Sequence, residues 1–259
     1  MNERVIKEIQ NTIKAQNVKN VAIFVDFDNI YYGMKDYGIN CEDVNYCIFT
    51  LLNKLYPKDM IRTMRAYADF DQVKVSLKLL QSKRVQIRNV YGNGKEEEHR
   101  KNASDIELSI DAIETYYKDN NIDTYVFLTS DSDMIPIMSR MLYKGKLVHL
   151  FYLNGHTTQY QNIGEYCHLS YDLIEIFEID INRSKPEYWK DAALTEIDNW
   201  YKIKAGSNKL LGGKWLNELF CEKLMLSRKL SSALIDYLIA NNFIEEKTND
   251  TGAKGYIIK

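Results

Sequence analysis

The sequence predicts an α/β protein: a three-layer main domain with a mainly parallel sheet, followed by a small C-terminal domain. The first observation is a short apolar, β-branched segment at residues 21–25, of the kind that is buried on both faces in a parallel sheet. The second is that such segments alternate with segments of helical periodicity over most of the chain. The third is a change of pattern near residue 182, after which helical segments follow one another.

The elements of the main domain, residues 1–182, are expected in this order along the chain. Residues 1–20 alternate charged and apolar residues at helical spacing. After the strand at 21–25, helical patterns occupy residues 41–56, 71–83, 104–120 and 134–145. Strand patterns occupy residues 60–70, 84–92, 123–133 and 146–153. The charged segment "GNGKEEEHRKN" at residues 92–102 is expected to be a mobile surface loop.

The C-terminal domain is expected to comprise residues 183–259. Pro186 opens a helical segment to residue 203, and two more helical segments occupy residues 212–224 and 227–242. A hairpin pattern with a glycine-containing turn follows at residues 243–259. Three helices and a hairpin are the order of a winged helix, which could bind nucleic acid, a protein partner or a second copy of the chain.

The bulk composition leaves both enzymes and nucleic-acid-binding proteins open. The chain has 259 residues, a formal net charge of -2 and four cysteines that form no CxxC pair. We expect these cysteines to be reduced thiols in a cytoplasmic protein. No segment approaches the roughly 20 apolar residues of a membrane span, so no membrane partner is expected.

Carboxylates follow two of the expected strands, at the edge where the carboxyl ends of parallel strands meet. Asp26 and Asp28 follow the strand at 21–25, and Asp131 and Asp133 end the segment at 123–133. Clustered carboxylates repel one another and lose hydration unless a cation neutralises them. Oxygen ligands favour Mg²⁺ or Mn²⁺, and such an ion can activate water for attack on a phosphodiester. The pattern therefore predicts metal-dependent phosphodiester hydrolysis.

A fourth carboxylate, Asp105, lies in the first turn of the expected helix at 104–120. An acid there is also a common helix-start residue. It shares a helix face with Leu108 and Ala112, which are core-like, so we expect its carboxylate to face the sheet edge. Asp111 and Glu114 fall elsewhere on the helix and are expected to be solvated.

Three motifs, "FVDFDNI", "KNASDIELSIDA" and "LTSDSDMIPIM", resemble in order and spacing the acidic motifs of NYN domains. These domains belong to the PIN-like nuclease superfamily, and the chain is most similar to the LabA-like branch. The resemblance covers residues 21–176 and implies a PIN-like fold and a metal-dependent nuclease acting on RNA. It implies that Asp26, Asp105, Asp131 and Asp133 are the catalytic acids and the metal ligands, and that Asn29 orients the first motif or contacts substrate.

Other residues near the motifs are candidate substrate contacts. Arg65 and Lys101 are candidate phosphate contacts. Ser130 stands directly before Asp131, where related motifs commonly have a glycine, and is a candidate substrate contact as well. The C-terminal domain loosely resembles the LOTUS modules that accompany some NYN domains, a likeness that rests on architecture more than on residues.

Two other functions are weighed against the nuclease. "VDFDN" also resembles the first motif of haloacid-dehalogenase-like phosphatases, in which Asp26 would be the nucleophile and Asp28 the general acid and base. Against this, Ile30 stands where that family has threonine or valine, and Asp105 would have no role. The second alternative is a non-catalytic NYN protein that binds nucleic acid or regulates a partner.

Overall fold

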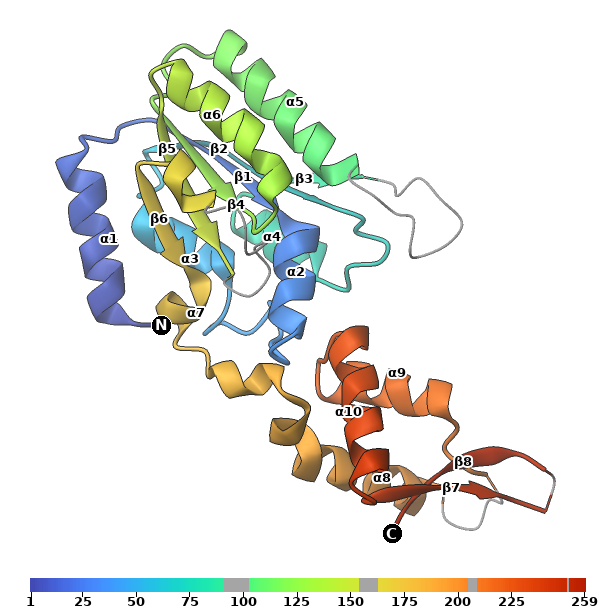
Figure 1. The fold of residues 1–259 in the computed structure, drawn as a ribbon. Helices are drawn as coiled ribbons and strands as arrows, with labels where there is room; N and C mark the ends of the chain where they lie inside the picture. The colour runs from blue at the N-terminus through green and yellow to red at the C-terminus, as the bar shows by residue number, and fades with distance from the viewer. Residues whose placement is uncertain (91–102, 154–162, 205–208, 251) are drawn as a thin grey trace. The chain divides into compact units, whose positions relative to one another are not determined.

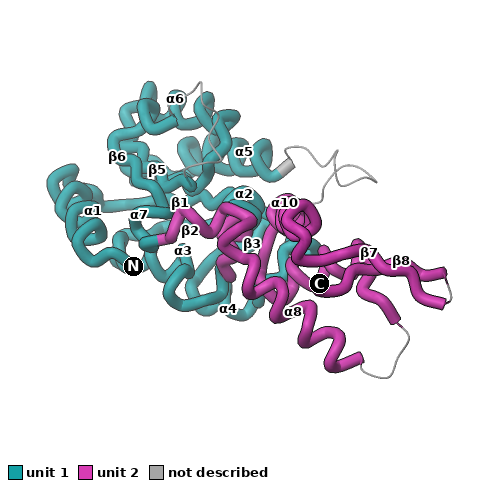
Figure 2. The backbone as a smooth tube through the Cα atoms, turned by 60° about the horizontal axis from the view of Figure 1, so that its bottom comes forward, with its two compact units in different colours: residues 1–33, 41–178 teal, residues 34–40, 179–259 magenta. Residues whose placement is uncertain are grey.

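A computed structural model describes residues 1–90, 103–153, 163–204, 209–250 and 252–259. The charged segment expected as a mobile surface loop, with Lys101, lies outside the described residues. The chain divides into two compact units, residues 1–33 with 41–178 and residues 34–40 with 179–259 (Figure 2). No described helix is long and apolar enough to cross a membrane.

The first unit is built on a six-stranded sheet in the order β3-β2-β1-β4-β5-β6. Its strands are β1 (Val21–Asp26), β2 (Ile61–Ala68), β3 (Gln86–Asn89), β4 (Thr124–Leu128), β5 (Leu147–Tyr152) and β6 (Leu169–Asp172). Each neighbouring pair is parallel, which confirms the predicted α/β class with its parallel sheet. The strand order reverses between β1 and β4, and ligands of open α/β sheets bind at such switch points.

Helices cover both faces of this sheet. They are α1 (Glu3–Ala15), α2 (Phe27–Lys35), α3 (Ile48–Leu55), α4 (Leu77–Ser82), α5 (Ala103–Lys118), α6 (Ile135–Tyr143) and α7 (Leu173–Phe177). Figure 1 shows α5 and α6 on one face and α1 and α3 on the other. The expected three-layer arrangement is thus present in the first unit.

Several helix bounds differ from those expected. Helix α2 follows β1 without a turn, although no helix was predicted there. Helix α3 begins at Ile48 rather than near residue 41, because Asp43 Oδ1 accepts the backbone N–H of Asn45 and favours a turn. Helix α4 begins after Ser76, whose hydroxyl accepts the N–H of Leu79 as an N-cap.

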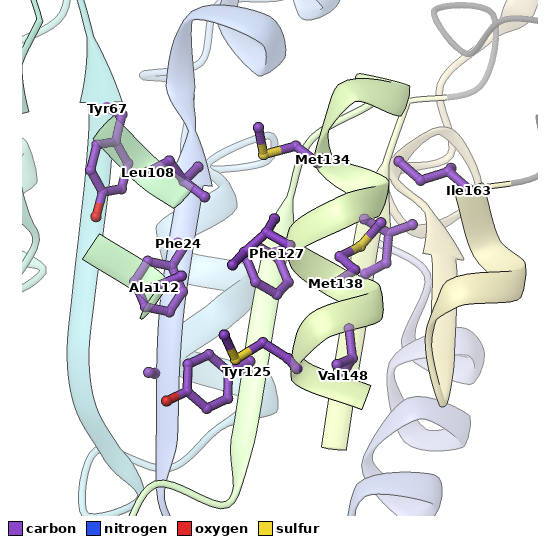
Figure 3. Close-up of a cluster of buried hydrophobic side chains, with 14 of the residues drawn as sticks. Phe24, Tyr67, Leu108, Ala112, Tyr125, Phe127, Met134, Met138, Val148 and Ile163 are labelled. Carbon is purple, nitrogen blue, oxygen red and sulfur yellow. The ribbon is translucent and has the colours of Figure 1, made fainter. Parts of the chain in front are cut away.

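The core under α5 and α6 fixes where the first turn of α5 lies. Phe24 of β1 stacks on Tyr125 and Phe127 of β4, with ring centroids 5.9 and 5.6 Å away (Figure 3). Leu108 and Ala112 of α5 are fully buried in this cluster, so the prediction that their helix face is the core face is confirmed. Because Asp105 lies one turn before Leu108, it faces the sheet as well.

The second unit contains three helices followed by a hairpin. These are α8 (Lys190–Ile203), α9 (Gly213–Lys223), α10 (Arg228–Ala240) and the antiparallel strands β7 (Ile244–Thr248) and β8 (Lys254–Ile258). The helix expected from residue 186 starts as a 3₁₀ turn, Pro186–Trp189. Gly38 belongs to this unit and has a φ of +61°, and a Cβ there would lie 2.3 Å from the Trp189 ring. Only glycine fits this position.

A buried histidine in β5 makes the stability of the first unit depend on pH. His149 Nδ1 lies 2.7 Å from the Tyr56 hydroxyl and Nε2 lies 2.7 Å from Gln16 Oε1, a pairing that suits the neutral ring. Burial, followed by the nearby His168, lowers the pKa of His149 to about 4. In the unfolded chain, His149 takes up a proton below the usual histidine pKa of about 6.5, whereas in the folded protein its ring stays neutral to lower pH.

We therefore predict that His149 lowers the free energy of unfolding as the pH falls from about 6.5 to 4. At pH 7 the His149→Gln variant should be less stable than the parent because it weakens two buried hydrogen bonds. At pH 5 this difference should shrink by about 2 kcal/mol, because only the parent then bears the protonation penalty. Urea unfolding at both pH values measures the change. An unchanged difference would mean that His149 titrates normally.

Candidate functional site

The Asp26 carboxyl is buried at the switch point of the sheet. Asp26 is the last residue of β1 and is 3% exposed. Its Oδ2 accepts the Thr129 hydroxyl at 3.0 Å, and its Oδ1 accepts the backbone N–H of Asn29 at 3.4 Å. Burial, reinforced by the charge of Asp105, raises the pKa of Asp26 well above its usual value.

Asp105, in the first turn of α5, meets Asp26 across this edge. The two carboxyl groups lie close enough to interact, and the charge of Asp105 contributes to the raised pKa of Asp26. Partial burial, followed by the charges of Asp131 and Asp133, raises the pKa of Asp105 to about 6. Asp105 therefore interacts electrostatically with each of the other three predicted acids.

The segment after β4 is held to the end of β1 by two further bonds. The Thr129 hydroxyl that donates to Asp26 also accepts the N–H of Asp131 at 3.0 Å. Asn29 Oδ1 accepts the N–H of Ser130 at 2.9 Å. The Ser130 hydroxyl is used elsewhere, since it accepts the N–H of Leu153 at 2.9 Å and lies 3.2 Å from the same residue's carbonyl. Asn29 and Ser130 thus join the first and third motifs through a backbone contact.

Asp133 lies further out than the other acids. It is exposed, and its N–H donates to Asp131 Oδ1 at 2.9 Å, so Asp131 caps the 3₁₀ turn Ser132–Met134. One oxygen of the Asp131 carboxylate thereby already accepts a hydrogen bond from the backbone N–H of Asp133.

Asp28 connects the first motif to two other elements. Its Oδ2 accepts the Ser104 hydroxyl at 3.0 Å and the N–H of Asp69 at 3.2 Å. Burial raises the pKa of Asp28. Asp28 therefore ties the start of α2 to the start of α5, on which Asp105 lies.

The expectation that Asp111 is solvated is wrong. Asp111 is 9% exposed, and its Oδ2 accepts the Tyr67 hydroxyl at 2.7 Å and Arg88 Nε at 3.1 Å. Arg65 Nη1 lies 3.5 Å from the same oxygen and donates to Thr115 Oγ1 at 3.0 Å. The partners from β2 and β3 lie far away in sequence, so helical spacing within α5 did not reveal them. Arg65, a candidate phosphate contact, is thus already paired.

The donor set suits a hard cation, although the acids do not form a closed cage. Among the described residues, no group of three or more His, Cys, Asp or Glu side chains is arranged to hold a metal ion. Mg²⁺ is commonly bound by one or two carboxylates and completed by water and substrate phosphate. The Asp26–Asp105 pair fits this mode, because a cation between the two groups would offset the charge repulsion that contributes to the raised pKa of Asp26.

Sequence reasoning missed Thr129 and Ser104. Both are short hydroxyl residues beside an acid of a motif, and Thr129 directly follows β4 at the switch point. Position at a strand's carboxyl end is the signal that could have indicated Thr129.

The parallel sheet and the acids at its switch point define an α/β protein of the PIN-like type. The chain belongs to the NYN domain family, whose family model matches residues 20–168. NYN domains are part of the PIN-like nuclease superfamily. No curated protein matches the chain. A crystal structure of a protein of unknown function from Vibrio parahaemolyticus is similar, with a TM-score of 0.44 and 17% identity, covering 60% of this chain and 92% of that chain.

We predict that Thr129→Val destabilises the first unit by about 1–3 kcal/mol, because it leaves a buried oxygen of Asp26 and the N–H of Asp131 without a partner. Thr129→Ser keeps the hydroxyl and should lower the free energy of unfolding by less than Thr129→Val does. Urea unfolding at pH 7 in chelator compares the two variants. Equal losses would contradict the role of the Thr129 hydroxyl, because only the valine variant removes it.

Asp105→Asn should stabilise the metal-free protein at pH 7. The folded-state pKa of about 6 lies above the usual Asp value, so ionisation opposes folding above pH 6 and the penalty vanishes below about pH 4. After allowance for partial exposure, the gain is on the order of 1 kcal/mol. Asp111→Asn on the same helix is the matched control and should destabilise at pH 7, because it weakens the bonds to Arg65 and Arg88. Thermal unfolding in chelator at pH 4 and 7 measures whether each variant is more or less stable than the parent.

Proposed function

We propose that this protein is a divalent-metal-dependent ribonuclease that hydrolyses phosphodiester bonds at the Asp26–Asp105 pair. The observation that supports this most directly is the approach of these two carboxyls to each other at the switch point of the sheet, where burial and neighbouring charge raise the pKa of both. Membership of the NYN family adds support, since PIN-like nucleases generally use divalent metals. The same membership favours a nuclease over a haloacid-dehalogenase-like phosphatase.

In this proposal Asp26 and Asp105 hold Mg²⁺ or Mn²⁺, and Asp131 and Asp133 contact the ion or its water ligands. The support is that the charges of Asp131 and Asp133 both raise the pKa of Asp105. When bound, the ion would supply an acidified water as nucleophile and neutralise charge on the leaving oxygen. The acids would thereby hold this water beside the phosphodiester.

The neighbouring polar residues are proposed to orient substrate and acids. Asn29 uses its Oδ1 on the Ser130 N–H, so its amide NH₂ is the group it would offer to RNA. Ser130 is proposed to position Asp131 through the backbone, because its hydroxyl is engaged with Leu153. Arg65 and Lys101 remain proposed phosphate contacts, and Arg65 would share its charge with Asp111.

The second unit is proposed to be a winged-helix-like, LOTUS-related module of a cytoplasmic protein. Its three helices followed by a hairpin support this. Helix α10 is capped by Ser227, and its first two residues are Arg228 and Lys229. This basic end would recruit RNA, whereas a protein partner or a homodimer is the alternative for the same module.

The proposed function predicts loss of cleavage on neutralising single acids. Asp26→Asn and Asp131→Asn should each lower Mn²⁺- or Mg²⁺-dependent cleavage of single-stranded RNA by about 10²-fold or more, because each removes a charge that holds the ion. Glu107→Gln, an exposed position on α5, is the control and should cleave at the parent rate. Product release is followed on gels with metal or with chelator, and circular dichroism checks the fold.

Two outcomes would contradict this function. If both aspartate variants cleave RNA like the parent, the assigned acids are not catalytic. If the parent binds RNA but cleaves neither RNA nor DNA with either metal, the non-catalytic alternative replaces the nuclease. Parallel reactions on single-stranded DNA and structured RNA assign the substrate class.

A further inference from the structure

A basic cavity lies in the first unit at the end of β1 and β2 that is opposite to Asp26. It has a volume of about 260 Å³ and is lined by Asn53, Lys58, Ile61, Arg62, Thr63, Met64, Arg84 and Gln86. Three of the lining residues are cations, and none carries a carboxylate. A cavity with this lining attracts an anion.

Arg62 reaches the cavity because the strand is irregular there. Val21 pairs with Ile61 and Ala22 pairs with Thr63, so Arg62 is the extra residue of a β-bulge. Bulges redirect a side chain and are frequent near functional sites. Arg62 Nε donates to Asn20 Oδ1 at 2.5 Å, which fixes the guanidinium and leaves its two terminal nitrogens for another acceptor.

The other two cations, Lys58 and Arg84, have no charged partner among the described residues. In the part of the chain that the structure describes, neither the Lys58 nor the Arg84 side chain has an ion pair or a hydrogen bond. Arg84 has a φ of +61°, a left-handed conformation that is unfavourable for arginine. This conformation is common directly after a helix, here α4, which ends at Ser82 with Lys83 as its C-cap.

Gln86 adds an oriented hydrogen-bond donor. Its Oε1 accepts Arg65 Nε at 3.3 Å and the Thr63 hydroxyl at 3.5 Å. The carboxamide therefore turns its oxygen to these residues and keeps its NH₂ group for a further acceptor. Guanidinium and amide N–H groups together match the oxygens of a phosphate.

The strand register places further cations between this cavity and the level of Asp26. Arg65 pairs with Phe24, and Tyr67 pairs with both Asp26 and Arg88. A second cavity of about 190 Å³ shares Arg62 and Thr63 with the first. It is also lined by Arg65, Arg88, Asp111, Glu114, Thr115, Lys118, Asp119 and Ile122. The basic residues thus continue along β2 and β3 toward the carboxyl edge, with acids interspersed in this second part.

We infer that the cavity of Lys58, Arg62 and Arg84 binds a backbone phosphate of the single-stranded RNA that is cleaved at Asp26. This inference rests on the proposed ribonuclease function. The volume lies below the roughly 300–1,000 Å³ of small-molecule pockets, which suits one phosphate rather than a larger cofactor. Five residues of β1 separate the level of Val21 from Asp26, or about 16 Å, so only an RNA of several nucleotides reaches both sites.

The test uses the full chain and the double variant Arg62→Gln/Arg84→Asn. Asparagine tolerates the left-handed backbone at position 84, and glutamine keeps a donor toward Asn20. The charge-matched control is Lys7→Gln/Arg140→Gln, two cations exposed on α1 and α6. The probe is a fluorescent single-stranded RNA of about 12 nucleotides, within the span of known single-strand sites, with binding followed by anisotropy in chelator.

We expect the double variant to bind this RNA about 10-fold more weakly than the control, with a salt dependence reduced by about 0.7 log units per log unit of salt, the value for loss of one phosphate contact. With Mn²⁺, its KM for the same RNA should rise while kcat stays unchanged, and cleavage of a trinucleotide should not change.

The inference is overturned if the double variant and the control bind the RNA equally, or if the salt dependence does not fall. It is also overturned if adenosine monophosphate displaces the RNA from the parent at concentrations similar to the Kd of the RNA, because the cavity would then be a site for free nucleotides. Binding is measured without metal, so a protein that binds as expected but never cleaves contradicts the ribonuclease proposal alone.

Discussion

The buried carboxyl of Asp26 at the end of β1 is the constraint on which the site depends. β1 lies between β2 and β4 at the point where the strand order reverses, so the segments after β1 and β4 start side by side. A carboxyl in this place needs partners because burial without hydrogen bonds is costly. The Thr129 hydroxyl and the Asn29 backbone N–H supply such partners, while Asp105 of α5 adds a second carboxyl whose charge acts on Asp26.

The two aspartates of helix α5 lie in opposite environments. Asp111 is neutralised by Arg65 and Arg88 and bonded to Tyr67, which attaches the helix to β2 and β3. Asp105 is left facing other carboxyls, and its pKa is raised. The favourable contacts of Asp111 and of the buried Leu108 offset the repulsion at Asp105. A site that repels itself when empty gains the most from a cation that neutralises it.

The sequence predicted the parts of this site that follow from local periodicity. The apolar run of β1 and the helical face of Leu108 and Ala112 were enough to place Asp26 and Asp105 at one edge. Contacts across distant segments were not accessible in this way, since Asp111 meets Arg88 and Tyr67 from other strands. Helix α2 was missed because its periodicity begins at the strand's last residue, with no intervening turn.

The second unit is assembled from two separated segments. Arg183 Nε and Nη2 donate to the carbonyls of Tyr37 and Gly38, at 2.7 and 2.9 Å, and Gly38 makes room for the Trp189 ring. Residues 34–40 leave the ribosome long before Arg183, because Arg183 follows Gly38 by 145 positions. At about 5–20 residues per second, that is a delay of roughly 7–30 s. The nascent chain can complete its parallel sheet during this interval, while a short loop emerging from its second helix waits for the C-terminal helices to be translated.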